Sequence, residues 1–196
     1  VKLIWQYNNK LEVNKLKEAW SYAQKRFSSL RLRLNWEEEL VQIIDKGGSL
    51  DWRYIDLSKE QDFTLQELKI KQIQEEDRFE PYKLEEGNLF KIYLIKQQEA
   101  LYTCIFSNHH AILDGWSNPI LLGYVHEVYL KLQDQQVVLP SIDSSYKDTQ
   151  KYLQEHLDNN KDYWNKYILS TEDRERSDLT GLLLSTNKQL RISEYK

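Results

Sequence analysis

One stretch decides how the chain is read: Ser107-Asn108-His109-His110-Ala111-Ile112-Leu113-Asp114-Gly115-Trp116-Ser117, which contains two of the four histidines. The run before it, 101–106, is apolar at nearly every position, which predicts a strand covered on both faces of a sheet. The run after it, 120–132, has apolar residues at helical spacing. The stretch is therefore expected to form a strand-to-helix loop, a frequent location of reactive groups.

The spacing within this stretch limits what its side chains do together. Neighbouring side chains on extended backbone point to opposite faces, so one of His109 and His110 is expected to face a reaction and the other to pack. His110 and Asp114 are four residues apart, which on a tight turn brings the carboxylate near the imidazole. In an open loop Asp114 could instead turn to a cation elsewhere, and the sequence leaves both possibilities open.

The end of the stretch has the features of a helix start. Ser117-Asn118-Pro119 offers a capping hydroxyl or amide followed by proline in the first turn, so the loop should end near Ser117. Gly115 would either permit a positive φ or let a ligand approach the backbone closely.

Other chemistries fit this sequence less well. A structural or catalytic zinc site needs three or four ligands at chelating spacing, and neither a cysteine pair nor a His-x-x-x-His pattern occurs. A Gly-x-Ser-x-Gly elbow for a serine nucleophile is also absent. Cys104 is the only cysteine, and its place in an apolar strand predicts a packing role.

Composition bounds the remaining classes of function. The chain of 196 residues, 40% hydrophobic with a net charge of -4, is long enough for one globular domain with a sizeable core. Its mixed charges contain no basic block, which argues against a nucleic acid or an anionic membrane as partner. Neither a transmembrane run nor a signal-peptide pattern occurs, so we expect a cytoplasmic protein. Methionine is absent even at position 1, which indicates either an excerpt of a longer polypeptide or methionines missing from the sequence.

The rest of the chain predicts strands alternating with helices, with strand hairpins between them. A helix is expected from a cap at Asn14, and another from a capping box at Ser58, with Leu65, Leu68 and Ile73 on its inner side. The alternating run 30–34 predicts a strand on which Arg31 and Arg33 share a face, paired with 40–44. Further strands are expected at 2–7, 52–55, 89–96, 101–106 and 189–192, and helical stretches around Tyr152 and Tyr163-Trp164. This order indicates an α/β sandwich with a mixed sheet.

The histidine stretch also carries a resemblance. His109-His110-Ala111-Ile112-Leu113-Asp114-Gly115-Trp116-Ser117 resembles the His-His-x-x-x-Asp-Gly signature of nonribosomal peptide synthetase condensation domains, of the chloramphenicol acetyltransferase-like superfamily. The residues after the aspartate, Gly115-Trp116-Ser117, favour condensation over the related epimerization domains. The two histidines favour it over heterocyclization domains, which have aspartate in their place. Three other segments are similar to the family's patterns: 26–34, which keeps Arg26, Leu30 and Arg31 but lacks the usual His-Glu, Thr and Phe; 146–148, where Thr149 follows in place of an aromatic; and Tyr163-Trp164.

This resemblance implies a fold and a reaction. The chain would be the N-terminal lobe, 1–196, of a two-lobed domain, with 168–196 leading towards a second lobe. The implied reaction is amide formation between a donor acyl or peptidyl thioester and the amine of an acceptor aminoacyl thioester. Both are carried on phosphopantetheine arms of carrier proteins, and no directly bound cofactor or metal is implied.

The resemblance also implies roles for single residues. His110 would be the principal catalytic side chain, with His109 supporting it and Asp114 holding the architecture through an ion pair with Arg31. Gly115, Trp116 and Ser117 would contact the substrate arm. Two alternatives remain: another acyltransferase of the superfamily, using coenzyme A or carrier-protein thioesters, and a non-catalytic lobe that only docks carrier proteins.

Overall fold

The computed structural model describes residues 1–37, 41–156 and 160–172. It divides into two units, 1–150 and 151–196. The predicted strand at 189–192 lies outside the described residues. In the first unit, the described strands form a four-stranded sheet in the order β1-β6-β5-β4 and a separate β2-β3 pair. Their bounds are β1 Lys2–Tyr7, β2 Leu32–Asn35, β3 Val41–Ile44, β4 Trp52–Asp56, β5 Phe90–Gln98 and β6 Leu101–Asn108.

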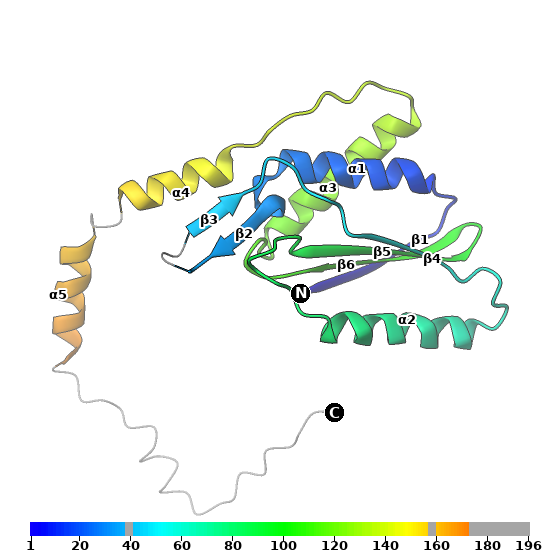
Figure 1. The fold of residues 1–196 in the computed structure, drawn as a ribbon, viewed down its shortest axis with the longest axis horizontal. Helices are drawn as coiled ribbons and strands as arrows, with labels where there is room; N and C mark the ends of the chain where they lie inside the picture. Colours follow the sequence, from blue (N-terminus) through cyan, green and yellow to red (C-terminus); the bar gives the residue numbers. More distant parts are fainter. Residues whose placement is uncertain (38–40, 157–159, 173–196) are drawn as a thin grey trace, which may run out of the picture. The chain divides into compact units, whose positions relative to one another are not determined.

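The larger sheet is mixed, as the sequence predicted. β1 and β5 both pair antiparallel with β6, and β4 pairs parallel with β5. Helices α1 (Val13–Arg26) and α3 (Ser117–Gln133) cover one face of the sheet, and α2 (Phe63–Phe79) covers the other (Figure 1). Helix α4 covers Ser145–Glu155. This arrangement confirms the α/β sandwich.

The two faces of the sheet differ in chemistry. Alternate side chains of β5 and β6, among them Phe90, Ile92 and Phe106, point towards α1 and α3 and belong to the main core. There Trp20 stacks on Phe106 at 5.2 Å and is fully buried. The other side chains meet α2 in a smaller cluster centred on Ile95 and Ile105. Because both faces are covered, the central strands read as continuous apolar runs.

Three predictions about helices α1 and α2 were wrong, two about their caps and one about the inner side of α2, where only Ile73 is confirmed. Helix α1 follows Glu12 and contains Asn14 in its first turn, so Asn14 is not its cap. Helix α2 starts after Asp62, whose carboxylate accepts from Thr64 N at 2.8 Å, while Ser58 bonds to Asp56 instead. The packed face of α2 is formed by Gln66, Ile70, Ile73 and Asp77, and Leu65 and Leu68 are exposed.

The alternating run at 30–34 does not form one strand. Residues Ser28–Arg31 make a 3-10 turn, η1, and β2 begins only at Leu32. The predicted pairing partner is correct, since β3 pairs antiparallel with β2 and Leu32 lies opposite Ile44. Arg31 and Arg33 therefore do not share a strand face, because Arg31 belongs to the turn.

The second unit is described only in part. Helix α5 (Lys161–Glu172) confirms the helical stretch predicted around Tyr163-Trp164, and the ring of Tyr163 stacks on that of Tyr167 at 6.2 Å.

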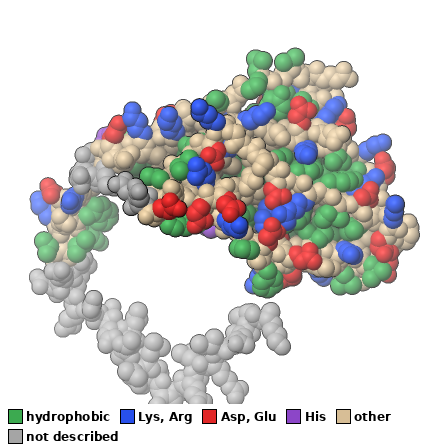
Figure 2. All heavy atoms as spheres, in the orientation of Figure 1, with side chains coloured by type: hydrophobic (Ala, Val, Ile, Leu, Met, Phe, Trp, Pro, Cys, Tyr) green, Lys and Arg blue, Asp and Glu red, His purple; other side chains and the backbone are tan. Residues whose placement is uncertain are grey.

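In the described ranges, none of the helices is long and apolar enough to cross a bilayer. On the face drawn in Figure 2, acidic and basic side chains are interspersed and not separated by sign.

We expect Trp20→Ala to lower the local stability of the sheet by about 3–5 kcal/mol, because it leaves a cavity against Phe106. Hydrogen exchange of β6 peptides in the native polypeptide would report this loss. Trp116→Ala is the matched control, since Trp116 is 85% exposed and its loss should change stability by less than about 0.5 kcal/mol. Equal effects of the two variants would contradict the core packing described here.

A second prediction concerns the Tyr7 hydroxyl, which lies 2.6 Å from His126 Nε2 between β1 and α3. Burial lowers the pKa of His126 below its ordinary value of 6.5. As the pH falls below about 6.5, His126 takes up a proton more readily in the unfolded chain than in the folded one. The free energy of unfolding should therefore be fully retained above about pH 6.5 and should decrease as the pH falls below it. His126→Gln should flatten this part of the pH profile of unfolding, and an unchanged profile would contradict the assignment.

Candidate functional site

The histidine loop between β6 and α3 is held at several points. His109 N donates to Leu89 O at 2.8 Å, which extends the β5-β6 pairing by one step beyond the strands. Ile112 N donates to His109 O at 3.3 Å, closing a turn. The side chains of Ile112 and Leu113 are buried in the main core. Apolar residues inside the motif thus anchor the loop, while the polar residues around them stay accessible.

His110 is exposed and lines a cavity of about 510 Å³. Its Nδ1 lies 2.8 Å from Leu113 O. A carbonyl oxygen can only accept, so Nδ1 carries the proton of the neutral ring. Nε2 then has a free lone pair, the state that a proton acceptor requires.

His109 is half-buried and is held differently. Its Nδ1 accepts from Ala111 N at 3.1 Å, so its neutral ring carries the proton on Nε2. The ring of Tyr82 meets that of His109 edge-on, with centroids 6.1 Å apart and planes at 76°. The two neighbouring histidines thus have opposite tautomers and different surroundings, in agreement with the expectation that one packs and the other does not.

Asp114 lies at the start of α3 and is exposed. One carboxylate oxygen accepts from Ser117 N at 2.8 Å and from Ser117 Oγ at 2.6 Å, and these bonds hold the pKa of Asp114 below its usual value. The side chain of Asp114, and not that of Ser117, therefore accepts from a backbone amide at the start of α3. Ser117 is the first residue of α3 and makes no capping bond of its own.

The expected ion pair between Arg31 and Asp114 is wrong. The guanidinium of Arg31 donates to the backbone carbonyls of Gln24, Lys25 and Asp45, at 3.0 Å to the first and 3.4 Å to the second. These bonds join the end of α1 to the segment after β3. Because Arg31 lies in the 3-10 turn, its guanidinium points towards these backbone carbonyls. Backbone carbonyls are present at every residue, so the sequence could not indicate them as partners.

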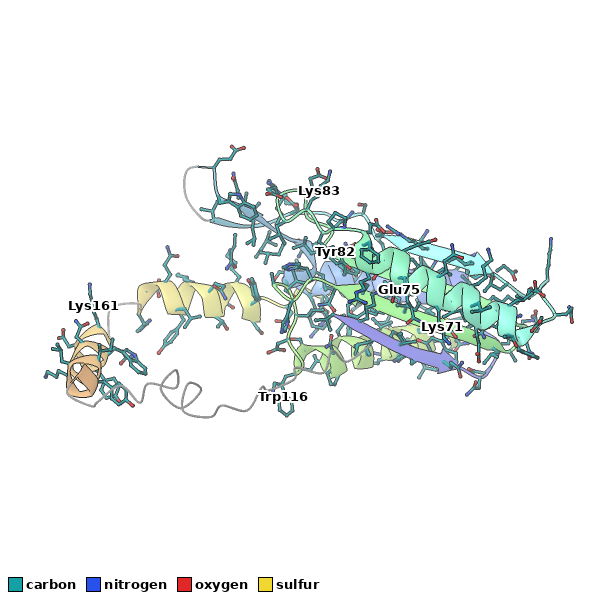
Figure 3. All side chains as sticks on the ribbon, turned by 90° about the horizontal axis from the view of Figure 1, so that it is seen from below. Lys71, Glu75, Tyr82, Lys83, Trp116 and Lys161 are labelled. Carbon is teal, nitrogen blue, oxygen red and sulfur yellow. The ribbon has the colours of Figure 1, made fainter. Side chains whose placement is uncertain are left out.

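Gly115 and Trp116 are both exposed. A Cβ built on Gly115 would meet no atom within 4 Å, and its φ is not positive, so the glycine is not required by backbone conformation. Trp116 projects from the start of α3 (Figure 3). Neither Gly115 nor Trp116 lines the cavity beside His110, and close ligand approach at Gly115 stays a prediction.

The cavity beside His110 is built by three parts of the chain: residues 27–29 at the start of the 3-10 turn, the histidine loop with the first turns of α3, and the segment 143–146. A parallel bridge between Phe27 and Asp143 joins the first and third parts, and Tyr146 OH donates to Gln42 Oε1 at 2.6 Å. The hydroxyl of Ser28, buried there, has no partner in the described structure. Ser28, Ser29, Asp143 and Ser145 could not be recognised as site residues from the sequence, because nothing in their spacing shows that these segments meet.

Cys104 confirms the packing prediction. It is fully buried in the main core, and burial raises the pKa of its thiol far above the ordinary value. His126 is bonded to Tyr7, which joins α3 to β1 away from the histidine loop. Among the described residues, no group of three His, Cys, Asp or Glu side chains is arranged to hold a metal ion.

Comparison with known proteins places these features in a family. Residues 1–181 match the family model described as "Condensation domain". N-(5-amino-5-carboxypentanoyl)-L-cysteinyl-D-valine synthase from Amycolatopsis lactamdurans is 41% identical over 184 residues, 93% of this chain and 5% of that protein. Bacitracin synthase 3 from Bacillus licheniformis is 28% identical over 162 residues, 81% of this chain and 2% of that protein.

A solved structure agrees with the fold. The starter condensation domain of rhizomide synthetase has a TM-score of 0.70 at 19% identity, covering 85% of this chain and 43% of that chain. This chain therefore spans less than half of that solved protein and about a twentieth of the Amycolatopsis synthase. Because the family model matches residues 1–181, most of the sequence, the chain belongs to the condensation domain family.

Proposed function

We propose that this chain forms part of an enzymatic domain that makes amide bonds between carrier-bound substrates. The amine of an acceptor aminoacyl thioester attacks the thioester carbonyl of a donor acyl or peptidyl group. A C–N bond forms, the C–S bond breaks, and the proton lost by the amine balances the thiolate that leaves as the donor arm. The observation that carries the proposal is the free Nε2 of His110 on the wall of a cavity.

His110 Nε2 is proposed to take the proton of the attacking amine. An α-amine has an ordinary pKa of about 7.7 to 8.0, so part of it is already neutral near pH 7 and a weak base suffices. The bond from Nδ1 to Leu113 O orients the ring and favours the positive charge that forms on it. The same Nε2, once protonated, is placed to donate to the tetrahedral intermediate.

The other motif residues are proposed to support this step. His109 packs behind the loop, and Asp114 fixes the start of α3 through Ser117. Gly115 leaves room for a substrate arm, with Trp116 and Ser117 beside it as contacts. Arg31 acts only through structure, by holding the turn that walls the cavity.

The proposed partners are an upstream donor and a downstream acceptor carrier protein, each presenting its substrate on a phosphopantetheine arm. The names of the relatives support this, because they are synthases of peptides. We further propose that 1–196 is an N-terminal lobe, with 168–196 leading to a second lobe, since the solved condensation domain is more than twice as long as the part matched. A cytoplasmic location stays a prediction from sequence.

The test is single-turnover condensation by the native polypeptide, with one loaded carrier protein as donor and another as acceptor, read by mass spectrometry. We expect His110→Ala to lower the rate constant by roughly 10²–10⁴, the usual contribution of a positioned acid or base. Leu68→Ala is the control, because Leu68 is exposed on α2 and does not line the cavity. Transfer to a hydroxylated acceptor without any aminoacyl carrier protein would instead favour another acyltransferase, and no transfer with cognate substrates would favour a docking role.

Two further variants separate proton transfer from simple hydrogen bonding at His110. Glutamine places an amide near the position of Nε2, and asparagine places one near Nδ1, but neither amide accepts a proton. If Nε2 acts as a base, His110→Gln and His110→Asn should both fall to the rate of the alanine variant. If His110→Gln instead keeps a rate constant within about tenfold of wild type, hydrogen bonding at the position of Nε2 is sufficient for catalysis.

A further inference from the structure

A buried carboxylate lies between the sheet and α2, on the face opposite α1 and α3. Asp77, near the end of α2, is 4% exposed. Three neighbouring side chains of the sheet lie in one row across β1, β6 and β5, because Lys2 and Lys91 are both in register with Ser107. Asp77 contacts all three: Lys2 Nζ at 3.2 Å, Lys91 Nζ at 3.7 Å and Ser107 Oγ at 2.8 Å.

The hydrogen bonds around Asp77 have a fixed direction. An ionised carboxylate can only accept, so Ser107 Oγ donates its hydrogen to Asp77. The lone pairs of Ser107 are then free to accept from Tyr82 OH, at 2.9 Å. A chain of two bonds therefore runs from Asp77 through Ser107 to Tyr82.

Tyr82 connects this chain to the histidine loop. Its ring meets the His109 ring edge-on, and Lys91 Nζ lies over the Tyr82 ring at 4.6 Å from the centroid. Lys91 is in turn held by Glu80 at 3.1 Å, so it does not move freely. Figure 3 shows Tyr82 at the end of α2, beside the strands. The side chain of Tyr82 is thus held by three contacts: its hydroxyl bonds to Ser107, Lys91 lies over its ring, and His109 meets the ring edge-on.

We propose, building on the proposed function, that Tyr82 is a positioning residue for the histidine loop and that Asp77 holds it in place through Ser107. The ring of Tyr82 sets the His109 ring, whose Nδ1 accepts from Ala111 N. Ala111 directly follows His110. The orientation of His110 towards the cavity therefore depends on a contact made from the opposite face of the sheet.

The chain supplies a matched control for this proposal. Tyr93 OH donates directly to Asp77 at 3.1 Å, and Tyr93 is buried, whereas Tyr82 is half-buried. Its ring belongs to the small cluster under α2 with Ile70, Ile95 and Ile105, away from the histidine loop. Tyr82→Phe removes the bond to Ser107. Tyr93→Phe removes two bonds, the one to Asp77 and the one that Tyr93 OH accepts from Arg53 Nη1 at 2.8 Å, but neither belongs to the chain that leads through Tyr82 to His109.

The experiment compares these two variants in the native polypeptide by hydrogen exchange and by single-turnover condensation at saturating carrier proteins. We expect Tyr82→Phe to speed exchange of the peptide 107–113 by about fivefold, the factor for one lost hydrogen bond. Its rate constant should fall by roughly tenfold with unchanged apparent affinity for both carriers, because misplacement acts on the chemical step. Ser107→Ala should reproduce both effects, and Tyr93→Phe should reproduce neither.

Equal changes in both tyrosine variants would overturn the proposal, since they would show that Asp77 contributes only to general stability. Unchanged exchange at 107–113 in Tyr82→Phe would overturn it as well, whatever the rate. The exchange measurement does not depend on activity. If wild type forms no dipeptide, the proposed function fails, while the response of the loop to Tyr82→Phe still decides whether Tyr82 positions it.

Discussion

The antiparallel ladder between β5 and β6 is the constraint on which the site depends. Its last pair joins Phe90 to Asn108, and the bond from His109 N to Leu89 O continues the ladder into the loop. A shift of one residue would turn each side chain of β6 to the opposite face, and Phe106 would lose its place against Trp20. The register that buries the core therefore also fixes where the histidines begin.

The two sides of this ladder perform different tasks. The side facing α1 and α3 is apolar and gives the loop its anchor through Ile112 and Leu113. The side facing α2 is partly polar, and its charges are paired: Arg53 holds Glu80 in a bidentate contact that lowers the pKa of Glu80 to about 2. Lys91 and Asp77 form a buried pair on the same side. A buried ion pair adds little net stability but is costly to break from one side, which favours a single arrangement.

Elements with strong periodicity could be predicted from the sequence. β1, β5, β6, α1 and α3 were found close to their observed bounds, because buried strands and amphipathic helices leave clear patterns. Helix starts were less predictable, since Asp62 and not Ser58 begins α2, and several residues near each end could serve as a cap. At 30–34 alternation favoured a strand, but the chain there first makes a 3-10 turn.

The site was predictable only where its residues are adjacent in sequence. The histidine loop and its division into one packed and one cavity-facing histidine could be inferred from local spacing. The wall formed by Ser28 and Asp143 could not, because it depends on a bridge between segments more than a hundred residues apart. The partners of Arg31 were missed for a related reason, since backbone carbonyls have no sequence signature.

The burial of Cys104 has a practical consequence. It is the only sulfhydryl in the sequence, it is enclosed by the core, and its raised pKa keeps it from forming a thiolate. Thiol-directed dyes or spin labels would therefore pass over the natural cysteine of this chain. A cysteine introduced on the exposed rim of the cavity would take up such a reporter selectively, which makes the chain well suited to following the arrival of a carrier arm by spectroscopy.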